Sequence, residues 1–487
     1  MIERPGDPPV AGPRPQPADG PRPDPARERL LTGTMLGIAT GSVLVPINST
    51  MLAVALPSVM DTFGVDAATV ASLVTVYLGA VAVALPASGS LGDRFGHRRV
   101  FLVGVLAFGL ASLLAASAAS FAVLAASRVL QAVSGALVST SAIALVRAEA
   151  PPDRRGAAFG LFDMLVSTSA ALGPLIGGLI VGWFGWRAMF FVAVPVAFVA
   201  AAAVGVLAPP RTVLVDEAAT AGRRPIDLPG LGLLALTLVA LLVALRGADA
   251  GVGGTIAAFA VVPLLAAFLV VELRTRHPAV DPRLFASKPF AAAITGVFGA
   301  TVVLHGCFLL VPLLVERLQH GSPETTGLVL LGISALGAIA APYGGRISDR
   351  IGRRAPAVAG MAATAVALAV LWQVAPGASS LVLAAALSVV GFGMGLSGSP
   401  RQAAALETIA PDRVGMAAGT YYTGRYLGGV VGASLAGAVL GGAVTGAGVS
   451  LGFGLLAAVA TIVVAASFGL PGRTVVGSRA RIGEGFR

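Results

Sequence analysis

The chain contains few charged residues, a single cysteine and a single lysine. Asp, Glu, Lys and Arg make up 11% of its 487 residues, whereas soluble domains carry about 25%. Cys307 has no second cysteine to pair with, which excludes an internal disulfide. Lys288 is the only lysine among 33 basic residues, and this preference for arginine favours a high-GC bacterial genome.

The sequence also lacks the signatures of enzymes and ATP-driven pumps. It has no Gly-x-x-x-x-Gly-Lys-[Ser/Thr] string, which argues against ATP as the driving force. It has no metal-ligand spacing and no nucleophile elbow, so we expect no enzyme, no metal and no cofactor. The net charge of +10 comes from arginines in short loops between apolar segments. Nucleic acid is therefore not an expected partner.

Apolar residues dominate what remains. They form 56% of the chain, which also contains 63 glycines, and the mean hydropathy is +0.88. No soluble core needs so much apolar sequence, and abundant small residues are typical of helices that approach each other closely in lipid. The composition predicts an all-α integral membrane protein.

Apolar runs long enough to cross a bilayer occur about fourteen times. A hydrocarbon core of about 30 Å needs about 20 apolar residues per helix. The predicted segments are 33–57, 67–91, 100–118, 121–147, 156–182, 187–208, 228–246, 252–273, 290–316, 324–347, 355–375, 379–404, 412–441 and 448–470.

The arginines of the loops predict the orientation. One set of alternate loops is rich in arginine, whereas the other carries only Arg187, Arg246 and Arg317. The positive-inside rule places the rich set and both termini in the cytoplasm. The expected location is the bacterial cell (inner) membrane, with the lipid bilayer as a partner.

One charged turn occurs twice. The first motif runs from Gly89 to Arg99 and the second from Gly345 to Arg354; Asp93 and Asp349 lie 349 − 93 = 256 residues apart. The shared positions are Gly89, Asp93, Arg94, Gly96 and Arg98 in the first motif and Gly345, Asp349, Arg350, Gly352 and Arg353 in the second. A repeat at this spacing predicts two homologous halves around a central path.

The repeat sets the expected domains. They are a disordered cytoplasmic tail at 1–29, a six-helix bundle at 30–208, a linker with two inserted helices at 209–289, a second six-helix bundle at 290–471 and a cytoplasmic tail at 472–487. The glycines of each motif allow a tight helix crossing, and its Asp can face the N-terminal end of a helix from the other half. We interpret the motifs as two cytoplasmic latches; the alternative is a pair of ordinary positively charged loops.

Further motifs give the chain a resemblance to a known family. Together with the repeated turn, Arg128-Val129-Leu130-Gln131 in 121–147 and Gly173-Pro174-Leu175-Ile176-Gly177-Gly178 in 156–182 resemble elements of the major facilitator superfamily. The stretch from Asn48 through Thr50 to Pro57 is similar to the signature of its fourteen-helix drug:proton antiporters, the EmrB/QacA type. The resemblance covers about residues 30–470.

The resemblance implies roles for these residues. Gly173, Pro174, Gly177 and Gly178 would form the kinked seam of an exporter, against the alternative of an ordinary proline kink. Arg128 and Gln131 would belong to a proton relay, in which Arg128 tunes a carboxylate on another helix. The alternative is a structural arginine satisfied by carbonyl groups and Gln131.

One position departs from the family pattern. Antiporters of this branch usually carry an Asp where this chain has Asn48, and asparagine cannot take up a proton. Asp163, the only acid well inside an apolar segment, is then the main candidate carrier, unless it caps or pairs with Arg94 or Arg147. His305 could shuttle protons or be simply hydrogen-bonded. Glu316 could belong to an outer gate, although an ion pair with Arg317 is the preferred interpretation.

The binding pocket is predicted only from residue type. Aromatic, Met and Arg side chains suit varied amphipathic ligands. The candidates are Tyr77, Phe162, Met164, Phe308, Met394, Tyr421, Tyr422 and Arg425. Arg425 could also contact the first motif.

We therefore expect a monomeric secondary transporter that exports drugs or other amphipathic or cationic small molecules. It would do so by proton antiport, with its two halves rocking about a midplane site. Two alternatives stay open: a dedicated exporter of one endogenous metabolite or antibiotic, and a non-transporting membrane sensor or scaffold.

Overall fold

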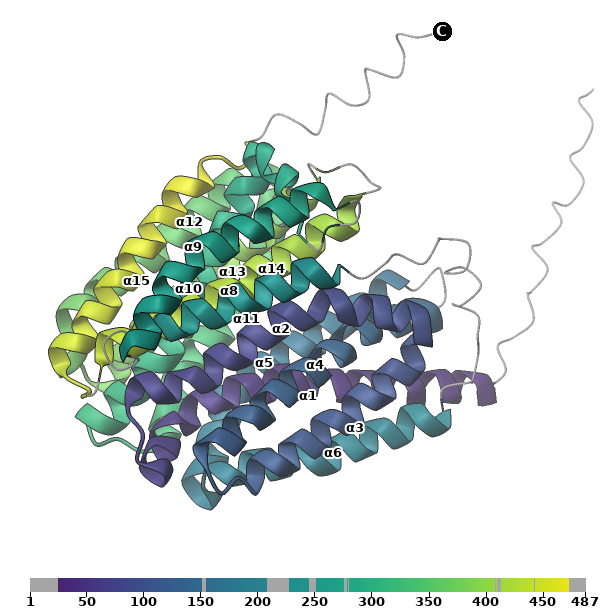
Figure 1. The fold of residues 1–487 in the computed structure, drawn as a ribbon, viewed down its shortest axis with the longest axis horizontal. Coiled ribbons are helices and arrows are strands. Elements are labelled where there is room, and N and C mark those ends of the chain that lie inside the picture. The colour runs from purple at the N-terminus through teal and green to yellow at the C-terminus, as the bar shows by residue number, and fades with distance from the viewer. Residues whose placement is uncertain are drawn as a thin grey trace, which may run out of the picture.

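The computed structural model describes residues 25–150, 155–207, 227–244, 251–275, 278, 280–407, 409, 413–441 and 443–472. Fourteen long α-helices account for most of them (Figure 1). They are α1 Pro25–Phe63, α2 Ala67–Phe95, α3 His97–Ala116, α4 Phe121–Glu149, α5 Arg155–Phe184, α6 Trp186–Leu207, α8 Leu228–Ala244, α9 Gly251–Arg274, α10 Lys288–Leu313, α11 Pro323–Ile351, α12 Arg354–Val374, α13 Ser380–Glu407, α14 Val414–Leu440 and α15 Gly446–Ser467.

Short helical turns complete the described part. A π-helical turn, Leu314–Leu318, continues α10, and two 3₁₀ turns, Pro282–Ala286 and Ala375–Gly377, precede α10 and follow α12. Twelve of the long helices are long and apolar enough to cross a membrane; α8, with 17 residues, is a shorter apolar helix. The expected all-α membrane fold with about fourteen helices is confirmed.

The two halves repeat the same helix pairings. In the first, α1 packs on α5 and α6, α3 on α4 and α6, and α2 on α4. In the second, α10 packs on α14 and α15, α12 on α13 and α15, and α11 on α13. These are equivalent pairs when helices 1–6 are superposed on the last six, as the repeated motif predicts. In Figure 1 the purple-to-blue helices form one bundle and the green-to-yellow helices the other.

Two helix pairs, α2 with α14 and α5 with α11, make the main contacts between the halves. The inserted helix α8 pairs with α9 and also touches α2. Its Leu234 and Leu238 form one apolar cluster with Ala82 of α2, against which Leu427 of α14 packs. The insertion therefore lies against the α2–α14 contact. The five-part division of the chain stays a prediction. Of the proposed tail at 1–29, residues 25–29 belong to α1 and the others lie outside the described residues, as does 473–487.

Each repeated motif breaks the helix at its second glycine. Gly96 has φ 87° and ends α2, and Gly352 has φ 94° and ends α11. Left-handed backbone of this kind strains any residue with a Cβ atom, so glycine is required at both positions. The turns bring the charged residues of both motifs to the helix ends where α3 and α12 begin. We call this end of the molecule the motif end and the other the opposite end.

Candidate functional site

A buried polar cluster connects α1, α2, α3 and α4. The Arg128 side chain is 1% exposed, and its Nη1 donates to Asn48 Oδ1 at 2.9 Å and to Gln131 Oε1 at 2.7 Å. Gln131 Nε2 donates in turn to Ser112 Oγ at 2.8 Å. The guanidinium carbon lies 4.1 Å from the centroid of the Tyr77 ring, a cation–π contact. Arg128 is thus tied to side-chain carbonyl groups and an aromatic face.

This geometry differs from the predicted relay, in which Arg128 tunes a carboxylate on another helix. Asn48 occupies the place of that carboxylate, and its amide oxygen accepts the hydrogen bond. Arg128 lies near the start of α4, at the opposite end, whereas Asp163 lies near the start of α5, at the motif end. The structure brings Arg128, Gln131 and Asn48 together and leaves Asp163 apart.

The three titratable candidates occupy different surroundings. Asp163 is exposed on α5 and has no hydrogen bond or ion pair with another residue of the described part, including its predicted partners Arg94 and Arg147. His305 Nδ1 lies 3.1 Å from the Thr301 carbonyl oxygen, within α10. The coupling roles of these residues stay predictions.

Glu316 and Arg317 do not pair with each other, contrary to the preferred interpretation. Glu316 Oε1 accepts a hydrogen bond from Thr326 Oγ1 at 3.0 Å. Arg317 Nη2 instead lies 2.7 Å from Asp61 Oδ1 and donates to the Pro57 carbonyl oxygen at 2.9 Å. Neighbouring residues of a helix point in different directions, so Arg317 turns toward α1 while Glu316 faces α11.

The Arg317–Asp61 pair joins the two halves at the opposite end. Asp61 lies in the last turn of α1, and Arg317 lies in the π turn that continues α10. The two residues are 317 − 61 = 256 positions apart, the same spacing as the repeated motif. They are therefore equivalent positions of the two halves that carry opposite charges. Sequence analysis missed Asp61, although this spacing could have revealed it.

The glycines of α5 bring three helices together. Gly173 faces the Thr50 side chain, and a Cβ at Gly177 would lie 3.0 Å from the Met51 Cα, so both approach α1 of their own half. A Cβ at Gly178 would lie 2.6 Å from the Pro323 carbonyl oxygen and 3.1 Å from the Gly327 Cα.

Gly178 thus provides a close approach between α5 and α11, at the opposite end. Pro174 lies inside α5, and its carbonyl oxygen would be 2.6 Å from a Cβ at Gly327. The predicted contact of this element with the other half is made by Gly178, whereas Gly173 and Gly177 pack on α1.

The first motif forms contacts inside its own half. Asp93, with a side chain 64% exposed, lies 3.2 Å from His97 Nε2. Arg98 Nη2 donates to the Gly205 carbonyl oxygen of α6 at 2.7 Å. Arg94 lies over the Phe95 ring at 5.3 Å, and Gly89 has open space around it. The described residues show no contact of Asp93 with a helix of the other half, and the predicted contact stays a prediction for another conformation.

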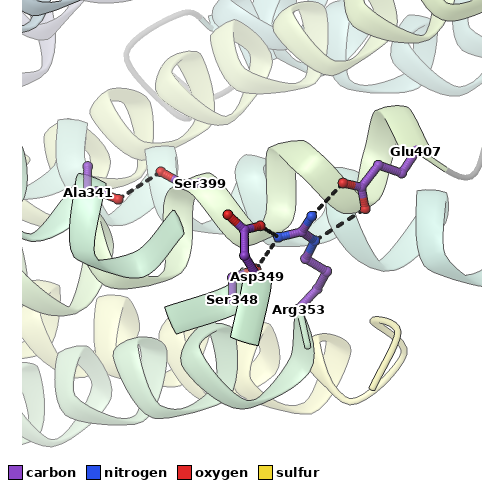
Figure 2. A network of polar contacts seen from close by, with 6 residues as sticks. All are labelled: Ala341, Ser348, Asp349, Arg353, Ser399 and Glu407. Carbon is purple, nitrogen blue, oxygen red and sulfur yellow. Dashed lines mark hydrogen bonds and ion pairs between the residues drawn. The ribbon is translucent and has the colours of Figure 1, made fainter. Parts of the chain in front are cut away.

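The second motif has more partners, again in its own half (Figure 2). Arg353 Nη1 lies 2.5 Å from Asp349 Oδ1 and donates to Ser348 Oγ at 2.7 Å. Its Nε donates to Glu407 Oε2 of α13 at 3.2 Å. The bond to Glu407, and then that to Asp349, raises the pKa of the Arg353 guanidinium above its usual value. Arg350 is exposed, and a Cβ at Gly345 would be in ordinary contact with Ser399 at 3.8 Å.

The predicted pocket residues differ in burial, and their assignment to one pocket stays a prediction. Phe162, Tyr77 and Phe308 are buried, Met394 is half-buried, and Met164 and Tyr422 are exposed. Arg401, a buried arginine of α13, donates to Ser397 Oγ at 2.9 Å and lies within electrostatic reach of Tyr421. Arg425 is exposed and lies within electrostatic reach of Tyr421 and His305.

Sequence analysis noticed neither Arg401 nor Glu407 as a site residue. Both lie near the motif end of α13, where Arg401 donates to Ser397 of its own helix and Glu407 binds Arg353. An arginine inside an apolar segment was the available signal for Arg401. Nothing in the sequence indicated that Glu407 would reach Arg353.

The match to a protein-family model covers most of the chain. The model described as the Major Facilitator Superfamily matches residues 38–433 and, in a second match, 293–485. Solved structures share the fold: a peptide transporter in complex with sulfate has 16% identity, a TM-score of 0.65, and coverage of 91% of this chain and 97% of that one. A bacterial homolog of the human lysosomal transporter Spinster, in an inward-facing and unoccupied conformation, has 17% identity, a TM-score of 0.64, and coverage of 92% and 98%.

Several relatives are named for resistance. The tetracenomycin C resistance and export protein of Streptomyces glaucescens is 34% identical over 69% of this chain, and the match spans 62% of that relative, less than two thirds. The multidrug resistance protein B homolog of Mycobacterium tuberculosis is 31% identical over 81% of this chain and 73% of its own length. A puromycin resistance protein of Streptomyces alboniger is 30% identical over 82% and 79%. With its fourteen-helix fold, its repeated half and these matches, the chain belongs to the major facilitator superfamily of multi-pass membrane transporters.

Proposed function

We propose that the chain is a secondary exporter that moves amphipathic small molecules, drugs and antibiotics among them, out of a bacterial cell in exchange for protons. The names of the relatives support export. The observation that carries the proposal is the close approach of Gly178 to α11, because it closes the opposite end with backbone packing between the two halves. An exporter of this fold alternates between closing that end and closing the other.

The contacts at the motif end are compatible with the other state of such a cycle, in which the motif end is closed. The charged residues of both motifs are exposed or bonded within their own half. They can therefore exchange these partners for partners across the halves without first breaking a buried contact. The loop arginines make the motif end cytoplasmic in this proposal. We infer that the two six-helix bundles rock as rigid units, in a monomer, while α8 and α9 remain at the α2–α14 contact.

Asp163 is the proposed proton carrier. It lies eight positions after the start of α5, further inside its helix than any other acid of the described part. It has no hydrogen-bond or ion-pair partner in the described part, so no arginine there holds it in the charged state. Asn48 cannot serve, and Arg128 is already bonded to Asn48 and Gln131.

The test is proton movement driven by a substrate. The purified protein is reconstituted into liposomes that contain a pH-sensitive dye, and a panel of amphipathic drugs is added from outside. We expect drug-dependent proton movement in the natural protein, a loss of roughly tenfold or more in Asp163→Asn, and partial recovery in Asp163→Glu, which restores a titratable group.

The possible outcomes test the proton carrier, the antiport step, transport itself and the substrate range separately. Unchanged proton movement in Asp163→Asn would remove Asp163 as the carrier. Drug transport without proton movement would remove the antiport step. No transport of any drug would favour a non-transporting sensor or scaffold. Transport of a single compound would favour a dedicated exporter, the alternative suggested by the relative named for tetracenomycin C.

A further inference from the structure

Among the described residues, the charge of Arg128 has no acidic partner. Both groups that accept hydrogen bonds from its Nη1, Asn48 Oδ1 and Gln131 Oε1, are neutral amides. The third neighbour is the ring of Tyr77, which also carries no formal charge. An isolated buried cation is strongly disfavoured, and amides offset only part of that cost. The cluster therefore carries a net positive charge that the described part of the protein does not balance.

The same cluster contains two hydrogen-bond donors that have no acceptor in the described part. Arg128 Nε and Asn48 Nδ2 are both buried and have no partner among the described residues. Buried polar atoms are almost always paired, so an unfilled one needs an explanation. Since both unfilled atoms carry N–H groups, the missing partner is an acceptor. A carboxylate, sulfonate or phenolate supplies both an acceptor and the missing negative charge, whereas an ammonium group supplies neither.

The charges of the helix interiors point the same way. Among the described α-helices, four residues of the Asp, Glu, Lys and Arg types lie six or more positions from both helix ends: Arg128, Asp163, Arg401 and Arg425. Three are positive and one is negative. The two that are buried, Arg128 and Arg401, are both positive, and buried charges act at low dielectric and are only weakly screened. Such an interior repels a cationic solute and attracts an anionic one.

The cluster lies beside a contact between the two halves. Tyr77, which is stacked on Arg128, belongs to one apolar cluster with Val430 of α14 in the other half. Leu78 of α2 approaches Gly429 of α14 in the same region. The positive charge is thus one aromatic ring away from the contact between the two halves, where the proposed transport path runs. A ligand that parts α2 from α14 meets this charge first.

We propose that the exported molecules carry an acidic group, and that Arg128 selects them by balancing that negative charge, while Nδ2 of Asn48 donates a further, neutral hydrogen bond to the same group. This inference rests on the proposed export function and narrows its substrate class. It replaces the cationic option that the sequence left open. Asn48 acquires a definite role: by not being an acid, it leaves the charge of Arg128 available to the substrate.

The test uses three fluorescent probes with one dansyl group and different charges: dansylglycine, which is anionic, its neutral glycinamide, and the cationic mono-dansyl ethylenediamine. Their affinities are measured with the full-length protein in an uncharged maltoside detergent. We expect dansylglycine to bind roughly tenfold or more tightly than the neutral probe, and the cationic probe to bind most weakly. The same probes are then followed in the liposome assay.

Asn48→Asp is the decisive variant. It places a carboxylate at the position of an oxygen that is 2.9 Å from Arg128 Nη1. The protein should remain folded because Arg128 gains a partner, and the preference for dansylglycine should fall about tenfold. Asn48→Ala is the matched control, since it removes the amide without neutralising the arginine. Because it loses one donor, it should bind dansylglycine less tightly than the natural protein, but it should still bind dansylglycine more tightly than the neutral and cationic probes, since Arg128 keeps its charge.

The outcomes separate this inference from the export function. Equal or tighter binding of the cationic probe by the natural protein would overturn the inference, and so would an anion preference that survives Asn48→Asp. Transport of the cationic probe alone would leave export intact and remove the acidic substrate class. Selective binding of dansylglycine without any transport would support the inference and count against export.

Discussion

The two ends of the molecule are held by different forces. At the opposite end, the halves meet through backbone, where a Cβ at Gly178 would lie 2.6 Å from the Pro323 carbonyl oxygen, and through the Arg317–Asp61 pair. At the motif end, Arg98 and Arg353 bond to groups of their own half. The comparison shows that the two ends depend on different kinds of contact. The opposite end depends on shape, which tolerates no added atom, whereas the motif end depends on charges that can change partners.

The largest effect is expected from Gly178→Ala, which disturbs the close packing of the opposite end. The added methyl group meets backbone of α11, which cannot move aside as a flexible side chain could. We expect the opposite end to stay partly open and transport to fall by roughly tenfold or more, which corresponds to about 1.4 kcal/mol or more. Initial transport rates in liposomes measure the effect.

Gly160→Ala is the matched control for this change. Gly160 lies on the same helix, and a Cβ there meets nothing within 4 Å. It should leave transport close to that of the natural protein. If both substitutions reduce transport equally, the loss reflects the flexibility of α5 and not its contact with α11.

A smaller effect is expected from the ion pair of the opposite end. Asp61→Asn removes the charge attraction to Arg317 and keeps the hydrogen bond of Arg317 to the Pro57 carbonyl oxygen. Because the Asp61 side chain is 67% exposed, the pair stabilises the closed end by about 0.2–1 kcal/mol. We expect a shift of up to about fivefold in the ratio of closed to open molecules, observed as a change in the distance between spin labels on α1 and α10.

The double variant Asp61→Arg with Arg317→Asp is the control. It exchanges the charges of two equivalent positions and should restore the distance distribution. Since the pair is exposed, the shift of the single variant should also shrink at high salt. A shift that is indifferent to salt, and that the double variant does not repair, would show that the pair acts through packing.

The smallest effects are expected at the motif end. There, one substitution in each motif allows the stability contributions of the two motifs to be compared. Arg353→Gln removes a guanidinium that bonds Asp349, Ser348 and Glu407, whereas Arg98→Gln removes one bond to a carbonyl oxygen. Because the acids are largely exposed, we expect the Arg353 variant to lose about 1 kcal/mol of stability and the Arg98 variant less than that. Thermal unfolding in detergent gives the order, and a larger loss for Arg98→Gln would contradict the asymmetry of the two motifs.

Sequence reasoning succeeded for features that depend on neighbouring residues. The segments predicted at 67–91 and 187–208 correspond to α2 and α6, because an apolar run of bilayer length can be satisfied only as a helix. The turns at Gly96 and Gly352 followed from the repeated motif for a similarly local reason, since both glycines adopt positive φ.

Sequence reasoning failed where the partner lies on another helix. Glu316 and Arg317 are adjacent in the chain, yet they bond Thr326 and Asp61 on different helices. The same holds for Glu407 and Arg353, which are 54 residues apart. No pattern of hydropathy reports the depth and rotation of two helices relative to each other, and those two quantities decide which polar groups meet.

The sequence by itself determined the membrane location, the number of helices, the duplication and the absence of an acid at Asn48, because these depend only on which residues follow one another. Only the tertiary structure decided that the oxygen of Asn48 accepts from Arg128, that two buried N–H donors there stay unfilled, and that Asp61 meets Arg317 across the halves. The physical reason is that the energy of a buried charge depends on its nearest neighbours. For Arg128 those neighbours come from helices that are brought together only when the bundle packs.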